Sequence, residues 1–352
     1  GDPDEAVALV EDLAQSKPGV ALLVSSSSTD GNLILRTMRA GAKEFLPYPI
    51  KPEDLAAALQ RVAKSKFGAG QHQNHGCKVV AISGATGGVG ATSLAVNLAC
   101  ELAQDKSNSV VLLDLDLALG DADVFLDSIP EYTLTDVAQN ISRLDFTLLK
   151  RSLTKHSTGL YLLPRPVQLE DAQLVSPEDL TRVIGLLKAT FTHLIIDTSK
   201  SFQELDMLAM RLADEVLMVT QLDLPCLRNV VRLLMSLEQT GELGEKVKIV
   251  VNRVGQGGAS ISVRKAQETL GREVYWQLPN DYKTMIEVRN NGVPLVEHAP
   301  KAGITQAIAG LAAEITGKKD SISPADLAGK GRSWLSLFGQ KNGKAEAGAD
   351  AK

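Results

Sequence analysis

A glycine-rich segment constrains this chain more than any other feature. Residues 83–93 (SGATGGVGATS) lie between an apolar run, Lys78–Ser83, and a helical pattern, Leu94–Ala103. A glycine-rich turn between a buried strand and a helix points several backbone N–H groups, and the positive end of the helix, at one place. The segment therefore predicts an anion-binding loop in which Thr92 or Ser93 offers a hydroxyl to Mg²⁺. The alternative is a turn whose glycines serve only tight packing of the strand against the helix.

Short apolar runs alternate with helical patterns along most of the chain. The runs are rich in Val, Ile and Leu without polar alternation, which is typical of parallel strands buried on both faces. This order predicts an α/β fold with a doubly wound, mostly parallel sheet, whose ligands bind at the carboxyl ends of the strands. The predicted strands are Lys78–Ser83, Ser109–Asp114, Leu160–Leu163, Thr192–Asp197, Asp214–Val219, Lys246–Val251 and Glu273–Trp276.

The composition excludes several classes of protein. A hydrophobic fraction of 44% in 352 residues is ample for a large core, which excludes wholesale disorder. The net charge of −5 gives no overall positive field, so we expect no specific nucleic-acid partner. Cys77, Cys100 and Cys226 lack the spacing of a disulfide framework or a zinc site. No apolar run reaches the roughly 18 residues of a membrane span, so we expect a cytoplasmic protein with at most peripheral membrane contact.

Changes in composition divide the chain into four parts. Residues 1–65 alternate helix and strand, 66–77 form a linker, 78–316 carry the regular alternation, and 317–352 are poor in apolar residues. We expect the last part to be a disordered tail. Its cluster Trp334–Phe338 would dock onto a partner or a membrane surface, or is a chance cluster in a disordered segment.

The N-terminal part resembles a known family in one stretch. Residues 41–49 (GAKEFLPYP), followed by Pro52–Leu55, resemble the last third of a response-regulator receiver domain. That family has a lysine before the proline, where this chain has Tyr48, and the strands of its acidic pocket are absent from this sequence. The sequence opens on Gly1 rather than on methionine, which leaves room for an upstream segment. The resemblance implies a partial, atypical receiver-like domain used for docking; the alternative is that Tyr48 and Pro49 form a packed loop.

The glycine-rich loop resembles the deviant Walker A motif of the MinD/ParA ATPases, KGGVGKT[ST]. The resemblance implies that ATP or ADP binds there with Mg²⁺. In that family the second lysine neutralises the β- and γ-phosphates, and the first reaches the partner's nucleotide across a dimer. Losing one charge-neutralising group costs roughly 10²–10³ in rate, so we expect nucleotide binding with slow or no hydrolysis. The matching residues are Thr86, Gly87, Gly88, Val89, Gly90, Ala91, Thr92 and Ser93, with Thr86 and Ala91 in place of the lysines.

Acidic residues follow two further predicted strands in the order of that family. Asp114 and Asp116 resemble the aspartates that begin switch I, and they are the candidate catalytic residues for positioning water; the alternative is a solvated strand end. Asp197 ends a strand similar to Walker B and would hold Mg²⁺ with Thr92, in part through water. Lys200 is either a replacement cation or a solvated loop lysine.

Two segments near the end of the alternation resemble the base-binding side of the family. Asn252 and Arg253 match the segment in which an asparagine contacts the edge of the adenine. Pro279, Asn280 and Asp281 match the loop that closes over the base, and Asp281 would equally cap the following helix. The resemblance therefore implies an adenine site between these two segments.

Three features together resemble one branch of the superfamily, the TadZ/CpaE pilus-assembly proteins. A receiver-like domain precedes the nucleotide-binding domain, alanine replaces the loop lysine at Ala91, and Val219–Asn229 resembles that branch's junction between strand and helix. The resemblance implies a protein that localises or scaffolds assembly of a Tad/Flp (type IVb) pilus, at the cell pole or inner-membrane face through its partners. Those partners would be pilus assembly and secretion proteins, and a homodimer would lack the usual lysine contact at Thr86.

Two other functions compete with this one. An active positioning ATPase of the MinD/ParA type, acting on a pilus, a flagellum or a cell pole, would recruit its cations from Lys200, Arg228, Arg253 or a partner. A DNA-binding segregation factor is disfavoured by the net charge of −5.

Overall fold

The computed structural model describes residues 2–17, 20–28, 30–67, 76–141, 144, 146–238, 241, 243–255 and 261–317. The chain divides into two compact units, Gly1–Gln73 and Asn74–Lys352. The predicted tail beyond Gly317, with its cluster Trp334–Phe338, lies outside the described residues, and so does most of the predicted linker. Within the described part of the chain, no helix is both long and apolar enough to cross a membrane.

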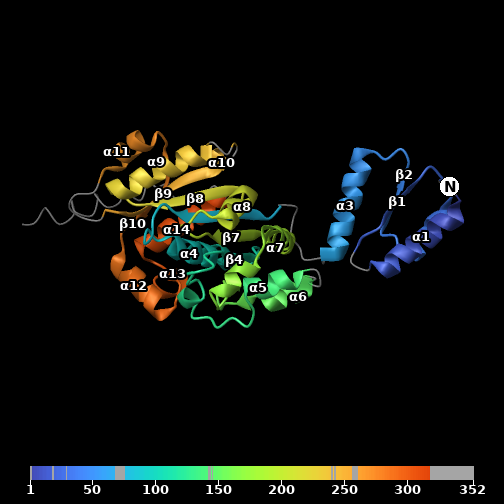
Figure 1. Ribbon diagram of the computed structural model, residues 1–352, viewed down its shortest axis with the longest axis horizontal. Coiled ribbons are helices and arrows are strands. Elements are labelled where there is room, and N and C mark those ends of the chain that lie inside the picture. The colour runs from blue at the N-terminus through green and yellow to red at the C-terminus, as the bar shows by residue number, and fades with distance from the viewer. Residues whose placement is uncertain are drawn as a thin grey trace, which may run out of the picture. The chain divides into compact units, whose positions relative to one another are not determined.

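The N-terminal unit packs helices against a short pair of parallel strands (Figure 1). In the register of this pair, Leu23 lies opposite Glu44. The elements in chain order are α1 (Pro3–Ser16), β1 (Leu23–Ser26), α2 (Gly31–Arg39), β2 (Glu44–Pro47) and α3 (Pro52–Phe67).

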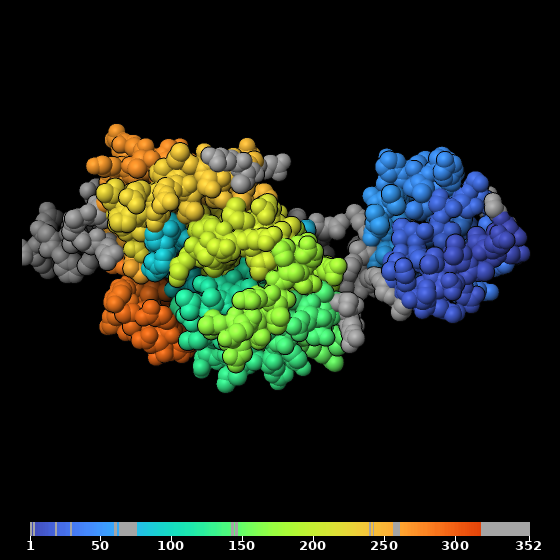
Figure 2. Space-filling model, in the orientation of Figure 1, coloured from blue at the N-terminus to red at the C-terminus, as the bar shows by residue number. Residues whose placement is uncertain are grey.

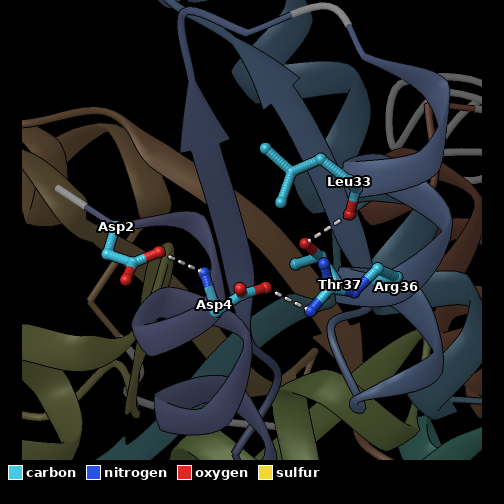
Figure 3. A network of polar contacts seen from close by, with 5 residues as sticks. All are labelled: Asp2, Asp4, Leu33, Arg36 and Thr37. Atoms are coloured by element: carbon cyan, nitrogen blue, oxygen red, sulfur yellow. Dashed lines mark hydrogen bonds and ion pairs between the residues drawn. The ribbon is translucent and has the colours of Figure 1, made fainter.

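Polar contacts fix the start of α1 and join it to α2 (Figure 3). The Asp2 carboxylate accepts a hydrogen bond from the Asp4 N–H at 3.0 Å and so caps α1. Arg36 of α2 forms an ion pair with Asp4. The Thr37 hydroxyl donates to the Leu33 carbonyl at 2.7 Å within α2. Of these contacts, the ion pair is the one that joins the two helices.

An eight-stranded sheet organises the C-terminal unit, in the order β10-β9-β8-β3-β7-β4-β6-β5. All neighbours pair in parallel except β5 and β6, which are antiparallel. The predicted doubly wound, mostly parallel sheet is thereby confirmed. Strand β5 was not predicted, because it has only two residues and no apolar run. The strands are β3 (Lys78–Gly84), β4 (Val110–Asp114), β5 (Thr154–Lys155), β6 (Tyr161–Leu163), β7 (His193–Asp197), β8 (Glu215–Thr220), β9 (Val247–Val254) and β10 (Val274–Pro279).

Helices cover both faces of this sheet (Figure 1). Val79 and Ala81 of β3 pack in a core cluster with residues of α5, α7, α8, α9 and α11, whereas Val80 and Ile82 pack with α4, α12, α13 and α14. Burial on both faces explains the unbroken apolar run of this strand. The helices are α4 (Ala91–Gln104), α5 (Leu134–Gln139), α6 (Phe146–Ser152), α7 (Pro177–Thr190), α8 (Glu204–Leu212), α9 (Leu224–Glu238), α10 (Leu243–Lys246), α11 (Val263–Leu270), α12 (Tyr282–Asn291), α13 (Leu295–His298) and α14 (Gly303–Ile315).

The carboxyl ends of the central strands meet at one edge of the sheet. Strand β3 pairs with β7 on one side and with β8 on the other, and β7 pairs in turn with β4. In this register Asp197 lies opposite Ile82 on β3 and opposite Asp114 on β4. The glycine-rich loop therefore begins beside both carboxylates, where doubly wound sheets bind their ligands.

Candidate functional site

The loop between β3 and α4 bends at two glycines with left-handed backbone. Gly88 has a φ of +79° and Gly90 a φ of +97°, a conformation that side chains rarely adopt. Gly90 is also the N-cap of α4, and it offers no side chain to cap that helix. The first-turn N–H groups of Ala91, Thr92 and Ser93 have no acceptor within the helix, so they can bind an anion.

Side chains from the end of β9 hold this loop through its carbonyl groups. Asn252 Nδ2 donates to the Val89 carbonyl at 2.8 Å. Arg253 Nη2 donates to the Gly88 carbonyl at 3.1 Å. Because the C=O and N–H of a trans peptide point in opposite directions, these bonds turn the N–H groups of Val89 and Gly90 away from β9. The loop amides are thus oriented before any ligand binds.

Two carboxylates are buried beside the loop. Asp114 ends β4 and Asp197 ends β7, and their side chains lie in the buried part of the unit. The Asp114 carboxylate accepts hydrogen bonds from the N–H groups of Asp116 at 3.1 Å and Ala122 at 3.2 Å. Neither carboxylate oxygen of Asp197 has a hydrogen-bond partner among the described residues. The Thr92 hydroxyl nevertheless lies near enough to favour the charged form of Asp197.

Burial raises the pKa of both carboxyls. The pKa of Asp114 rises from 3.8 to about 7, chiefly through burial and further through the charges of Asp116 and Asp123, while the two backbone N–H groups lower it. The pKa of Asp197 is raised well above 3.8 by burial first and by the charge of Asp114 second. The Asp114 charge therefore disfavours the charged form of Asp197, and a cation bound at Asp197 would reverse this effect.

These groups fit a divalent cation that brings further ligands with it. The described residues hold no group of three or more His, Cys, Asp or Glu side chains arranged for a metal ion. Mg²⁺ is usually held by one or two carboxylates together with phosphate oxygens and water, so a larger protein cage is unnecessary. The unpartnered Asp197 and the nearby Thr92 hydroxyl are donors of this kind, and the buried Ser83 hydroxyl also lacks a partner.

A pocket of about 630 Å³, open solvent at its mouth included, adjoins the loop at Gly90. The pocket is lined by every residue predicted for the base-binding side, together with apolar side chains of β10, α12 and α14. An apolar wall with a few polar groups suits a planar base. The predicted residues that line it are Gly90, Ser93, Asn252, Arg253, Pro279, Asn280 and Asp281; those that do not are Thr86, Gly87, Gly88, Val89, Ala91, Thr92, Asp114, Asp116 and Asp197.

Polar atoms of two pocket residues are already engaged within the chain. Asn252 donates through Nδ2 to the loop, and its Oδ1 accepts from the Arg253 N–H at 2.8 Å. Asp281 Oδ1 accepts from the Thr284 N–H at 3.3 Å and caps α12. The expected capping role of Asp281 is confirmed, and Asn252 has a role in holding the loop that the sequence did not indicate.

Comparisons with known proteins agree with this geometry. Residues 77–249 match the AAA domain family. The septum site-determining protein MinD of Thermotoga maritima is 29% identical over 223 residues, which cover 62% of this chain and 80% of that protein. A ParA family ATPase from Chlorobium tepidum superposes with a TM-score of 0.64 at 26% identity, covering 67% of this chain and 98% of that one. MinD from Pyrococcus horikoshii, complexed with Mg-ADP, superposes with a TM-score of 0.60 at 25% identity, covering 70% and 100%.

The chain is therefore similar to the MinD/ParA ATPases in sequence and in fold. It has short, uncharged side chains where the MinD/ParA loop carries its lysines. The Thr86 hydroxyl lies 3.4 Å from the Cys226 sulfur of α9, and Ala91 packs against the core cluster of α4. Neither residue brings a charge to the loop. A methyl group placed on Gly87 would lie 3.7 Å from Lys200 Nζ, so that lysine is near the loop.

The Asp116 carboxylate is already engaged in hydrogen bonding within the chain, which the MinD/ParA resemblance did not indicate. One of its carboxylate oxygens accepts from the Leu119 N–H at 3.1 Å, and its own N–H donates to Asp114. Asp116 thus shapes the turn after β4 whether or not it orients water.

Sequence reasoning missed several contributors to this site. Gly120 lies so close to the Asp114 carboxylate that a methyl group there would overlap with it, and Gln221 Nε2 donates to the Gly88 carbonyl at 3.4 Å. Both depend on contacts between distant segments, which no local pattern shows. Arg289 lines the pocket from α12. It follows another pocket residue, Met285, by four positions, and this helical spacing was a usable signal.

Proposed function

We propose that this chain binds ATP or ADP together with Mg²⁺ and hydrolyses ATP slowly or not at all. The observation that carries the proposal is Asp197, whose two buried oxygens lack partners next to a loop of oriented amides. The absence of lysine at positions 86 and 91 supports slow turnover, since phosphoryl transfer relies on positioning and charge neutralisation. The Mg-ADP complex of the Pyrococcus horikoshii MinD supports the choice of ligand.

In this proposal each part of the site has one task. The loop amides hold the phosphates, Asp197 and Thr92 hold Mg²⁺ in part through water, and the pocket beside Gly90 holds the base. Bound Mg²⁺ supplies positive charge to the phosphates. Asp116 orients water through its second carboxylate oxygen. Asp114, opposite Asp197 on the neighbouring strand, remains a buried acid whose carboxylate accepts hydrogen bonds from two backbone N–H groups.

Titration calorimetry of the full chain with ATP and ADP, each with Mg²⁺ and with EDTA, tests this activity. We expect Mg²⁺-dependent binding of both nucleotides and phosphate release near background. Absence of heat at millimolar nucleotide would refute the binding. Brisk Mg²⁺-dependent hydrolysis that disappears in Asp116→Ala would refute the slow turnover instead.

We further propose that the chain localises or scaffolds a Tad/Flp pilus from the cytoplasm, with pilus assembly proteins as its partners and the cell pole as its site. The support is the order of the two units, a small β/α unit followed by the nucleotide-binding one. In the first unit Tyr48, which stands where receiver domains have lysine, is 68% exposed and is available to a partner. A strain lacking this gene should lose its pili, and a fluorescent fusion should gather at the pole. Normal piliation of the deletion strain would contradict this role.

An active positioning ATPase is the second candidate. One observation favours it: Lys200 and Arg253 both lie beside the loop and offer cations from outside the motif. Phosphate release measured with and without the pilus assembly proteins separates the two functions. Strong stimulation by a partner would favour the ATPase, and unchanged background release would favour the scaffold.

A further inference from the structure

The connection between β7 and α8 is fixed by one buried acid. Asp206, the third residue of α8, is 3% exposed, and its carboxylate accepts from the Ser199 N–H at 2.9 Å and from the Gln203 N–H at 2.9 Å. The hydroxyls of Ser199 and Ser201 donate to the same carboxylate at 2.7 and 3.3 Å. Lys200 lies between these anchored residues, so its backbone is held in place while its side chain is exposed.

Lys200 extends across the glycine-rich loop from this anchored connection. A methyl group on Gly87 would meet its side chain at 3.6 Å from Cδ and at 3.7 Å from Nζ. Among the described residues, no acidic side chain forms an ion pair with Lys200. In Figure 2 the loop (cyan) reaches the surface between the yellow atoms of α9 and the yellow-green atoms around α8. The ammonium group is therefore an uncompensated charge at an open part of the loop.

The loop itself supplies no other side-chain charge to a bound phosphate, because it carries no charged side chain. Thr86 and Ala91 stand at its two lysine positions, where the Thr86 hydroxyl contacts the Cys226 sulfur and Ala91 packs against the core. At the same edge of the sheet, both carboxylate oxygens of Asp197 are buried with no hydrogen-bond partner among the described residues. A polyphosphate there would meet backbone amides and carboxylates, and an ammonium group that donates to it would add a charge-assisted hydrogen bond.

We propose that Lys200 is the phosphate-binding cation of this site and takes the place of the lysines that the loop lacks. The proposal rests on the nucleotide binding proposed above and names the group that contacts its terminal phosphates. Lys200 reaches the loop from the segment after β7, whereas the missing lysines belong to the loop itself. Asp206 is the positioning residue, since it fixes the backbone on both sides of Lys200.

Nucleotide titrations of matched variants test this assignment. Lys200→Ala should weaken Mg-ATP binding about 10-fold, the scale of one charge-assisted hydrogen bond, while adenosine binding stays unchanged. Lys200→Arg should retain most of the ATP affinity. Lys265→Ala removes an exposed lysine from α11 and controls for net charge, and it should bind as the wild type does.

The outcomes distinguish this inference from the proposed function. Equal ATP affinity of Lys200→Ala and the wild type overturns the role of Lys200 and leaves nucleotide binding intact. A wild-type chain that binds neither ATP nor adenosine overturns both. A loss of ATP affinity in Lys265→Ala as large as in Lys200→Ala also overturns the assignment, because it would show a general charge effect.

An acyl phosphate of ATP gives a direct readout of position. The neutral amine of a lysine beside the phosphates attacks the acyl carbon; an amide forms, the bond between acyl group and phosphate breaks, ATP leaves and the proton passes to solvent. Mass spectrometry of the labelled wild type should find the acyl group on Lys200, with protection by excess ATP. Labelling elsewhere with Lys200 unmodified would refute the contact. Lys200→Arg should bind ATP yet lose the label.

Discussion

Replacing Asp197 by asparagine should stabilise the ligand-free protein at alkaline pH. Both Asp114 and Asp197 have a folded-state pKa above the unfolded value, so the folded chain binds more protons than the unfolded chain above pH 4. Stability therefore falls as the pH rises through the interval between the unfolded and folded pKa values. For Asp114 that interval runs from 3.8 to about 7, and it corresponds to about 4 kcal/mol.

The asparagine removes one of the two buried charges and its repulsion of the other. Because neither Asp197 oxygen has a hydrogen-bond partner among the described residues, the substitution breaks no such bond there. We expect a gain of about 1–4 kcal/mol in the free energy of unfolding at pH 8, up to the cost worked out above for a buried carboxylate of this kind. The melting temperature should rise by about 2–4 °C for each kcal/mol. The gain should shrink as the pH falls, because protonation of the wild-type carboxyl then removes the same charge.

Denaturant and thermal unfolding of the full chain in EDTA, at pH 5 and pH 8, measures this difference. Asp121→Asn is the matched control, because Asp121 lies exposed in the segment after β4. It should change stability little at either pH. The reasoning is refuted if Asp197→Asn is less stable than the wild type at pH 8. That result would mean that the carboxylate has a favourable partner.

Four substitutions test the loop and its surroundings. Gly90→Ala places a side chain at a φ of +97°, so it should lower the free energy of unfolding by about 1–3 kcal/mol and weaken nucleotide binding. In Gly87→Ala the new methyl group has contacts no closer than 3.6 Å, so stability and nucleotide binding should change little. Denaturation measures the first quantity and nucleotide titration the second. Gly120→Ala would overlap with Asp114 and should cost about 1–3 kcal/mol in urea unfolding. Ala91→Lys returns a charge to the loop and should raise phosphate release by about 10²–10³-fold; an unchanged rate would place the defect elsewhere.

Local patterns predicted the parts of the site that are continuous in sequence. The glycine-rich loop needed only its own residues and the strand and helix beside it, because its geometry follows from left-handed glycines and a helix start. The strands were predicted from their apolar runs, which are typical of strands buried on both faces. The pairing of β4 with β7 then brings Asp114 and Asp197 together. The resemblance to the MinD/ParA ATPases followed from the order of these motifs.

Contacts between distant segments could not be predicted in this way. Asn252 was assigned to the base, but its amide nitrogen donates to the loop and its oxygen accepts from Arg253. That arrangement depends on how far β9 extends and on its place two strands from β3, both of which are tertiary properties. The approach of Lys200 to Gly87 has the same origin, since it depends on the four bonds that Asp206 makes.

The charges at this site do not balance without a ligand. The two acids, Asp114 and Asp197, are buried and cost stability when charged. In place of the lysines of the MinD/ParA loop, this site has backbone dipoles and two cations from outside the loop, Lys200 and Arg253. Mg²⁺ is the group that would relieve both problems, because it neutralises the carboxylates and the phosphates at once. Nucleotide binding and folding stability should therefore be coupled through the same two carboxylates. A chain of this kind can hold a triphosphate with oriented amides and a metal ion although its loop lacks both lysines of the MinD/ParA motif.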